Sequence, residues 1–199
     1  MTGPRRAACP RCARPAATCL CALAAPTPNA LPVLVLQHPR EAREAKGSAR
    51  LLALSLARCR VEIGERFDDA RLHALLHAEG RRSVLLYPVV ELVPAPASID
   101  GAPPTQLVVL DGTWRKCLRM LLAHPLLQAL PRQRLRSPPD SAYRSLRKAP
   151  RAGLLSTLEA TALALGELEQ APARYDALRR AFAAFVADGA ARQTRSAAA

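Results

Sequence analysis

Short apolar runs alternate with helix-like segments along most of this chain of 199 residues. Continuous apolar runs bounded by polar or turn residues are typical of strands that are buried on both faces of a sheet. We expect strands within residues 32–39, 60–67, 82–88, 106–112 and 133–137, and helices within residues 45–59, 68–80, 114–124, 156–169 and 174–189. This alternation predicts an α/β fold with a mainly parallel sheet.

Four of the six cysteines lie in the N-terminal stretch CPRCARPAATCLC. A C-x2-C pair followed shortly by C-x-C suits four thiolates around one tetrahedral zinc ion. The stretch also has too few apolar residues to form a core of its own, so a metal would hold it together. The alternative is a set of reduced or redox-active thiols. We expect a structural zinc ion, held by Cys9, Cys12, Cys19 and Cys21.

The Pro-rich run ALAAPTPNALP separates this stretch from the strand-and-helix region. We therefore expect a zinc-binding module with its linker in residues 1–30, a catalytic domain in residues 31–189 and a disordered Ala-rich tail in residues 190–199.

The net charge of +13 and the pI near 10.7 favour a polyanionic partner, most simply a nucleic acid. Residues 132–151 alone carry seven Arg or Lys against one Asp. The alternative explanation of the same charge is an Arg-rich coding bias. No apolar run is long enough to span a bilayer, and the basic N-terminus lacks the apolar core of a signal peptide, so we expect a cytoplasmic protein with no membrane contact.

The stretch LVVLDGTWRKC, residues 107–117, is the main candidate for a functional site. An apolar strand ends there in Asp111. The only Trp of a chain with 4% aromatics, Trp114, follows three residues later. Ligands of open α/β sheets bind beyond the carboxyl ends of strands, so we expect an exposed carboxylate at this place. Trp114 could instead belong to the core. Neither a G-x-G-x-x-G fingerprint nor a phosphate-binding P-loop is present.

Two other patterns have structural explanations. Ser156 and Glu159 fit the S-x-x-E capping box, although the N-terminus of the same helix is also a suitable place for a carboxylate or phosphate. His73 and His77 are four residues apart on one helix and have no third ligand, so we interpret them as surface residues.

The stretch LDGTW resembles the D-x-T-W signature of the DTW-domain family, and the other segments follow in the family's order. QHPREAREAKGSARLLALSL is similar to its H-P-x-E segment and following helix, LLYP to its third-strand end, and LLSTLEA to its S-T-x-E-A helix start. The cysteines resemble the N-terminal cluster of bacterial members. One departure is KGSAR, where Gly47 and Ser48 replace an Asn-Thr-like pair.

The resemblance implies a SPOUT-like fold with a C-terminal trefoil knot and S-adenosylmethionine as cofactor. Characterised members are tRNA-uridine aminocarboxypropyltransferases. The implied reaction moves the 3-amino-3-carboxypropyl group of S-adenosylmethionine to N3 of a tRNA uridine and releases methylthioadenosine. We therefore expect tRNA as partner, with no DNA binding, a modified base in the variable loop and a monomeric protein.

The same resemblance, together with the strand ends, gives the candidate site residues. The catalytic residues are Asp111 as general base, Thr113 and Trp114. The cofactor-binding residues are Leu86, Pro88, Leu110, Asp111, Trp114, Leu155, Ser156, Thr157 and Glu159. The substrate-binding residues are His38, Glu41, Lys46, Ser48, Arg144, Arg147 and Lys148.

Two other functions remain open at this level. A SPOUT-type RNA methyltransferase would use the same cofactor and fold, because nothing in the sequence fixes which carbon of the cofactor faces the acceptor. A non-catalytic, zinc-containing RNA-binding protein would explain the charge and the cysteines, but not the D-x-T-W segment.

Overall fold

The computed structural model describes residues 8–90, 92–93, 102–136 and 155–197. Five parallel strands form one sheet in the order β2-β1-β4-β3-β5. The strands are β1 (Val33–Gln37), β2 (Cys59–Ile63), β3 (Ser83–Leu86), β4 (Gln106–Asp111) and β5 (Arg132–Gln133). The predicted α/β class is confirmed, and in the described residues the sheet is entirely parallel.

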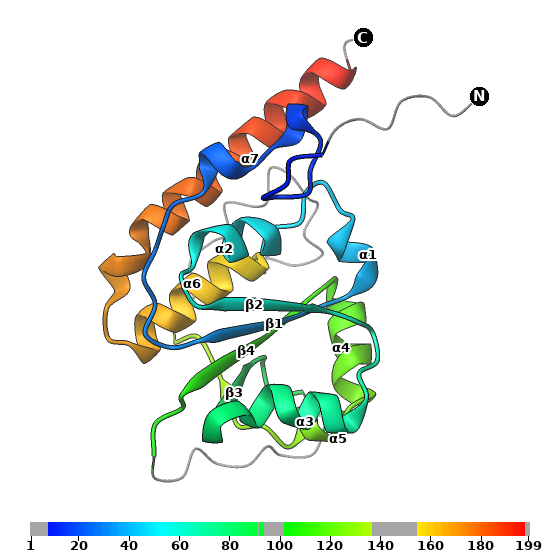
Figure 1. The fold of residues 1–199 in the computed structure, drawn as a ribbon, viewed down its shortest axis with the longest axis vertical. Coiled ribbons are helices and arrows are strands. Elements are labelled where there is room, and N and C mark those ends of the chain that lie inside the picture. The colour runs from blue at the N-terminus through cyan, green and yellow to red at the C-terminus, as the bar shows by residue number, and fades with distance from the viewer. Residues whose placement is uncertain (1–7, 91, 94–101, 137–154, 198–199) are drawn as a thin grey trace, which may run out of the picture.

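Helices cover both faces of the sheet (Figure 1). On one face, α2 (Ala49–Ser55), α6 (Thr157–Leu168) and α7 (Asp176–Ala197) pack against Val33 and Val35 of β1. On the other face, α3 (Asp69–His77), α4 (Trp114–Leu122) and α5 (Pro125–Gln128) pack against Leu34 and Leu36. Because successive side chains of a strand point to opposite faces, burial on both sides explains the unbroken apolar run of β1. None of the described helices is both long and apolar enough to cross a membrane.

The helix starts follow from local capping. His38 Nδ1 accepts a hydrogen bond from the backbone N–H of Arg40 at the start of α1 (Pro39–Ala42), and Asp68 caps α3 in the same way. Ser156 and Glu159 form the predicted capping box at the start of α6, which is confirmed. At the other end of α3, the short 3₁₀ turn η3 (Ala78–Gly80) ends at Gly80, whose φ of 70° favours glycine.

Several boundaries differ from the sequence prediction. The helix expected from residue 45 begins at Ala49, because the chain first forms α1 and a turn in which Gly47 N–H bonds to the carbonyl of Glu44. The short helices α1 and α5 were not predicted, and each begins with a proline, which suits the first helical turn. The last helix continues past Ala190 to Ala197, where we predicted a disordered tail; the Ala-rich sequence has high helix propensity.

The cysteine-rich segment is fastened to the sheet domain. It contains two 3₁₀ turns, η1 (Ala16–Thr18) and η2 (Cys21–Leu23). A separate 3₁₀ turn, η5 (Pro172–Tyr175), lies elsewhere in the chain and precedes α7. Leu20 is 3% exposed and belongs to the core between the sheet and α2, α6 and α7. Arg50 of α2 donates a hydrogen bond to the carbonyl oxygen of Cys12 at 2.7 Å. The segment therefore shares the core of the rest of the chain.

Replacement of Leu20 tests this attachment. Leu20→Ala should lower the free energy of unfolding by about 2–4 kcal/mol, because it leaves a cavity in the core. Leu122→Ala is the control, since Leu122 on α4 is 43% exposed and its loss should change stability by less than about 0.5 kcal/mol. Urea denaturation of both variants measures the difference. Equal stabilities would mean that the cysteine-rich segment is not part of the core.

Candidate active site and metal centre

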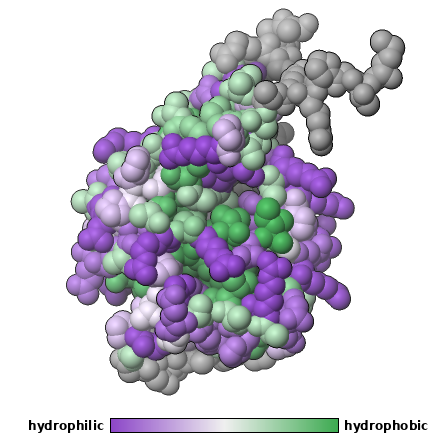
Figure 2. Space-filling view, viewed as in Figure 1, coloured by the Kyte–Doolittle hydropathy of each residue, from purple (hydrophilic) through white to green (hydrophobic). Residues whose placement is uncertain are grey.

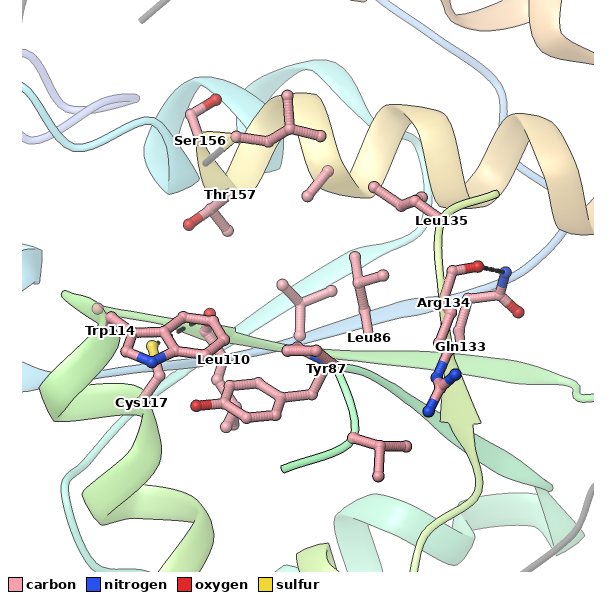
Figure 3. Close-up of a pocket in the computed structure, with 16 residues that line it drawn as sticks. Leu86, Tyr87, Leu110, Trp114, Cys117, Gln133, Arg134, Leu135, Ser156 and Thr157 are labelled. Atoms are coloured by element: carbon pink, nitrogen blue, oxygen red, sulfur yellow. Dashed lines mark hydrogen bonds between the residues drawn. The ribbon is translucent and has the colours of Figure 1, made fainter. Parts of the chain in front are cut away.

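A cavity of about 620 Å³ opens at the carboxyl ends of β3, β4 and β5, where it is closed by the start of α6 (Figure 3). Its volume lies in the range of small-molecule sites, and its place is the one where open α/β sheets bind ligands. The lining residues are Leu86, Tyr87, Pro88, Val89, Val109, Leu110, Gly112, Trp114, Cys117, Gln133, Arg134, Leu135, Leu155, Ser156, Thr157 and Ala160.

An aromatic pair forms one wall of the cavity. The rings of Tyr87 and Trp114 stack with centroids 5.1 Å apart and an angle of 7° between their planes. Trp114 is 46% exposed, which excludes the alternative that it only fills the core. Tyr87 is buried, and its hydroxyl has no hydrogen-bond partner among the described residues. Burial raises the pKa of this hydroxyl. The pair thus presents a flat, fixed indole face to a ligand.

Asp111 lies behind the cavity wall. Gln37 Nε2 donates to its Oδ2 at 2.8 Å, and Thr157 Oγ1 donates to its Oδ1 at 2.6 Å. The residue is 5% exposed, so the expectation of an exposed strand-end carboxylate is wrong. The reason is the pairing of β1 with β4 and the approach of α6, which enclose the end of β4. Asp111 reaches the cavity through Thr157, which lines it.

The start of α6 brings two hydroxyls to the site. Ser156 Oγ accepts from the backbone N–H of Glu159, and Glu159 Oε2 accepts from the backbone N–H of Ser156, so both side chains serve the capping box. In Figure 3 the hydroxyl of Ser156 turns away from the cavity, whereas the side chain of Thr157 points toward Leu110 and Trp114. Thr157 is therefore the hydroxyl that faces a ligand.

The turn after β4 leaves little room for a larger residue. A Cβ added at Gly112 would lie 3.2 Å from Cys117 Sγ and 3.2 Å from Lys116 Cβ. Cys117 Sγ donates to the carbonyl of Leu110 at 3.6 Å, and burial raises the pKa of this thiol to about 12. A protonated, hydrogen-bonded thiol of this kind is a packing group, not a nucleophile.

The residues predicted to bind substrate near α1 and α2 lie outside the cavity lining. Glu41 Oε1 accepts a hydrogen bond from Lys116 Nζ at 2.7 Å, and this largely buried ion pair ties α1 to α4. His38 is buried with its Nε2 3.3 Å from Glu65 Oε2. Ser48 Oγ accepts from the backbone N–H of Leu158 at 3.3 Å, which joins α2 to α6.

The structure thus brings part of the predicted set together. Leu86, Pro88, Leu110, Trp114, Leu155, Ser156 and Thr157 all line the cavity, whereas Asp111 and Glu159 stand behind it. Thr113 is an exposed N-cap residue of α4, and Lys46 is partly buried in the turn before α2. Arg144, Arg147 and Lys148 lie outside the described residues.

Sequence reasoning missed Tyr87, Gln37 and Arg134. Tyr87 lies between Leu86 and Pro88, which we predicted to bind the cofactor, so its position in that segment could have identified it. Gln37 is the last residue of β1 and precedes His38, which we predicted to bind substrate. Arg134 follows a strand of two residues, and nothing in the sequence sets it apart from the other arginines nearby.

Four thiols gather in the N-terminal segment. The Sγ atoms of Cys9, Cys12, Cys19 and Cys21 all lie within 4.8 Å of one another, with Cys9–Cys21 and Cys12–Cys19 both at 3.6 Å. These separations are too long for disulfides and close to the roughly 3.8 Å between sulfurs that share a tetrahedral metal at 2.3 Å. The cysteines are not disulfide-bonded.

The surroundings favour a thiolate in this cluster. Burial opposes ionisation of Cys12, but hydrogen bonds with the backbone at Leu20 and Arg14 outweigh it and lower the pKa of this thiol to about 6. In Cys21, burial and the neighbouring thiols raise the pKa to about 12, so without a metal the cluster favours one thiolate at Cys12. Since the thiolate is the form that binds metals, the donor set fits a metal ion.

Comparisons with known proteins match this chain to one family. A family model described as "DTW domain" matches residues 6–189. A Drosophila melanogaster protein named tRNA-uridine aminocarboxypropyltransferase 2 is 35% identical over 174 residues, which cover 84% of this chain and 69% of the relative. The Macaca fascicularis protein of the same name is 32% identical, with 83% of this chain and 58% of the relative covered.

A more distant relative comes from a plant. The Arabidopsis thaliana protein named tRNA-uridine aminocarboxypropyltransferase A is 28% identical over 199 residues, with 83% of this chain and 74% of the relative covered. The chain thus spans about three fifths of the macaque protein and about two thirds to three quarters of the other two. No solved structure gives a significant match.

Proposed function

Because this chain belongs to the DTW-domain family, we propose that it is a tRNA-uridine aminocarboxypropyltransferase. It would move the 3-amino-3-carboxypropyl group of S-adenosylmethionine to N3 of a tRNA uridine and release methylthioadenosine. One structural observation carries the proposal: the D-x-T-W segment, the third-strand end and the start of α6 all meet in one cavity. These are the segments that define the resemblance to the family.

The cavity suits S-adenosylmethionine, the donor substrate. Apolar side chains such as Leu86, Leu110 and Leu135 can enclose the adenine ring. The start of the twelve-residue helix α6 borders the cavity, and helix N-termini favour a carboxylate such as that of the donor. Arg134 is an exposed residue of the lining, and its guanidinium is a second group suited to that carboxylate.

The residues can meet both demands of the reaction. A uridine N3–H is a weak acid, and a carboxylate that accepts its proton contributes about 10²–10⁴-fold to the rate. Asp111 is the carboxylate hydrogen-bonded to a hydroxyl of the cavity lining. The donor's sulfonium activates its methylene carbon, so the remaining task is alignment, which the fixed face of Trp114 can provide. Thr113, at the N-cap of α4, borders the same turn.

The distribution of arginines supports tRNA as the partner. Several exposed arginines follow the carboxyl ends of strands, where the cavity opens, and their guanidinium groups make no hydrogen bond or ion pair within the described part of the chain. They are Arg40, Arg43, Arg66, Arg115, Arg134 and Arg136. We call this set the carboxyl-edge arginines. Such uncommitted cations suit RNA phosphates.

Arginines at the other end of the sheet are already bound to the protein. Arg58 donates to the carbonyl of Ala30, Arg82 to the carbonyl of Pro103, and Arg174 forms an ion pair with Glu169. These three line one surface hollow near the amino ends of the strands. Figure 2 shows that hydrophilic residues cover much of the viewed face around a small apolar area. The placement of the carboxyl-edge arginines, not the overall charge, therefore points to the RNA surface.

We further propose that the four-cysteine cluster holds a structural zinc ion. Its four sulfurs match the preference of zinc for tetrahedral thiolate sites. Bound there, the ion would fix a segment whose Arg14 Nη2 lies 3.4 Å from the carbonyl of Glu44 in the turn between α1 and α2. The zinc would then hold in place the turn between α1 and α2. This turn contains Lys46, and the carboxyl-edge arginines Arg40 and Arg43 lie next to it in the chain.

Other expectations remain proposals. The trefoil knot would involve the connection from β5 to α6, and residues 137–154 of that connection lie outside the described residues, as do Arg144, Arg147 and Lys148. We keep these three as RNA-binding residues, and a monomer, a cytoplasmic location and a variable-loop uridine as further expectations. The domain limit at residue 30 is a proposal as well.

Mass analysis of tRNA tests the function. Deletion of the gene should remove an aminocarboxypropyl group from one uridine of the cell's tRNA, and the purified protein with S-adenosylmethionine should restore it. Nucleoside mass spectrometry measures both steps. A methyl group gained in place of the aminocarboxypropyl group would show a methyltransferase, and unchanged tRNA in both steps would contradict a role in tRNA modification.

The carboxyl-edge arginines provide a second test. Replacement of Arg40, Arg43 and Arg115 by Gln should weaken tRNA binding at least about tenfold and make its salt dependence shallower by roughly 0.7–0.9 for each lost phosphate contact. S-adenosylmethionine affinity should stay the same. The matched control replaces Arg58, Arg82 and Arg174 by Gln, which removes equal charge from the other edge. Equal losses in both triple variants would show that only net charge matters.

Metal analysis tests the cysteine cluster. The purified protein should contain a single zinc ion per chain, and Cys12→Ser should lose it together with part of the protein's stability. Cys59→Ser serves as the control, because Cys59 lies in β2 away from the cluster. Elemental analysis and thermal unfolding give the two readouts. A zinc-free protein whose N-terminal segment is nevertheless ordered would contradict a metal centre.

A further inference from the structure

We propose that Thr157 is a catalytic residue that relays the proton of uridine N3 to Asp111, and that Gln37 is the residue that orients Asp111 for this task. The proposal rests on the proposed function and adds to it the path of the proton. It follows from the positions of three side chains at the ends of β1 and β4 and the start of α6.

The first step concerns what Thr157 can offer to a ligand. A threonine hydroxyl has a single hydrogen and two acceptor lone pairs. Thr157 Oγ1 donates that hydrogen to Asp111 Oδ1 at 2.6 Å, a distance typical of a hydroxyl bound to an ionised carboxylate. Thr157 also lines the cavity. Toward a ligand in the cavity its oxygen therefore acts as an acceptor, which is the property needed to receive an N–H proton.

The second step concerns Asp111. Asp111 is 5% exposed and is not part of the cavity lining. Direct contact between its carboxylate and a substrate would therefore require the cavity wall to move. Gln37 Nε2 donates to Oδ2 at 2.8 Å and leaves Oδ1 turned to Thr157. Gln37 and Asp111 are also register partners in the paired strands β1 and β4. The sheet itself thus sets the direction of the carboxylate.

The neighbouring hydroxyls do not fit this role. Ser156 Oγ accepts the N–H of Glu159 within the capping box and turns away from the cavity (Figure 3). Thr161 is fully buried and donates to the backbone carbonyl of Thr157 at 2.7 Å. Of these three hydroxyls on α6, Thr157 alone joins the cavity to a carboxylate.

The proton and electron balance is complete without another reactant. The N3–H proton passes to Thr157 Oγ1 as the hydroxyl's own proton passes to Asp111 Oδ1. The N3 electron pair forms the new N–C bond to the methylene carbon of the donor, and the C–S pair returns to sulfur, which becomes the neutral thioether of methylthioadenosine. Asp111 ends protonated and returns the proton to solvent after product release.

Matched variants of α6 test the relay. Thr157→Val removes the hydroxyl with little change in shape and should lower turnover on tRNA at neutral pH by roughly 100-fold or more, the scale of a lost general base. Thr157→Ser keeps a hydroxyl and should stay within a few-fold of wild type. Thr161→Val is the control for loss of a threonine hydroxyl on the same helix and should also stay close to wild type. S-adenosylmethionine affinity should change little in all three.

The pH profile separates a relay from a purely structural role. Higher pH deprotonates N3 without help from the protein, so the gap between Thr157→Val and wild type should narrow as pH rises. Asp111→Asn should show the same narrowing, and the double variant should be no slower than the slower single variant, because both act in one step. Gln37→Met removes the donor to Asp111 Oδ2, so the acid limb of the pH profile should move to higher pH.

The possible results are distinguishable. If wild-type protein transfers no aminocarboxypropyl group to tRNA, the proposed function fails. If wild type transfers the group and Thr157→Val is equally fast, only the relay fails. Joint loss of turnover and donor affinity in Thr157→Val would assign Thr157 to donor binding and overturn the relay, as would a gap between the variants that is constant with pH.

Discussion

The hydrogen bonds that the Asp111 carboxylate accepts from Gln37 and Thr157 connect the parts of the molecule on which the site depends. Gln37 brings in the end of β1, Asp111 the end of β4, and Thr157 the start of α6. A buried carboxylate needs such donors, because an unpaired buried charge would destabilise the fold. The same bonds that keep Asp111 in the protein interior also fix the Thr157 hydroxyl on the cavity wall. Stability and chemistry at this place therefore have one origin.

The parallel sheet explains why the other features share one edge. Every strand delivers its carboxyl end to the same side, so the aromatic pair after β3 and β4, the start of α6 and the carboxyl-edge arginines all lie at one edge of the sheet. A large polyanion can then be held by the arginines while one extruded base enters the cavity. The cysteine-rich segment lies outside the sheet and hydrogen-bonds to α2 and to the turn before it.

Much of this arrangement could be predicted from the sequence, and the remainder depended on tertiary contacts. Periodicity predicted the parallel sheet, and residue spacing predicted the capping box. The family resemblance and the strand ends predicted seven of the sixteen residues that line the cavity. They could not show that Asp111 is enclosed, because its burial depends on the pairing of β1 with β4 and on α6, which lies 46 residues further along the chain. Tyr87 was missed for the same reason, since its partner Trp114 follows a different strand.

The central claim is the identity of the group that reaches tRNA, and isotope labelling measures it most directly. Purified protein is incubated with tRNA and S-adenosylmethionine that carries radioactive carbon either in its carboxyl group or in its methyl group. We predict that the carboxyl label enters tRNA and that the methyl label stays in methylthioadenosine. Methyl label in tRNA, with the carboxyl label left in the small-molecule product, would contradict the account.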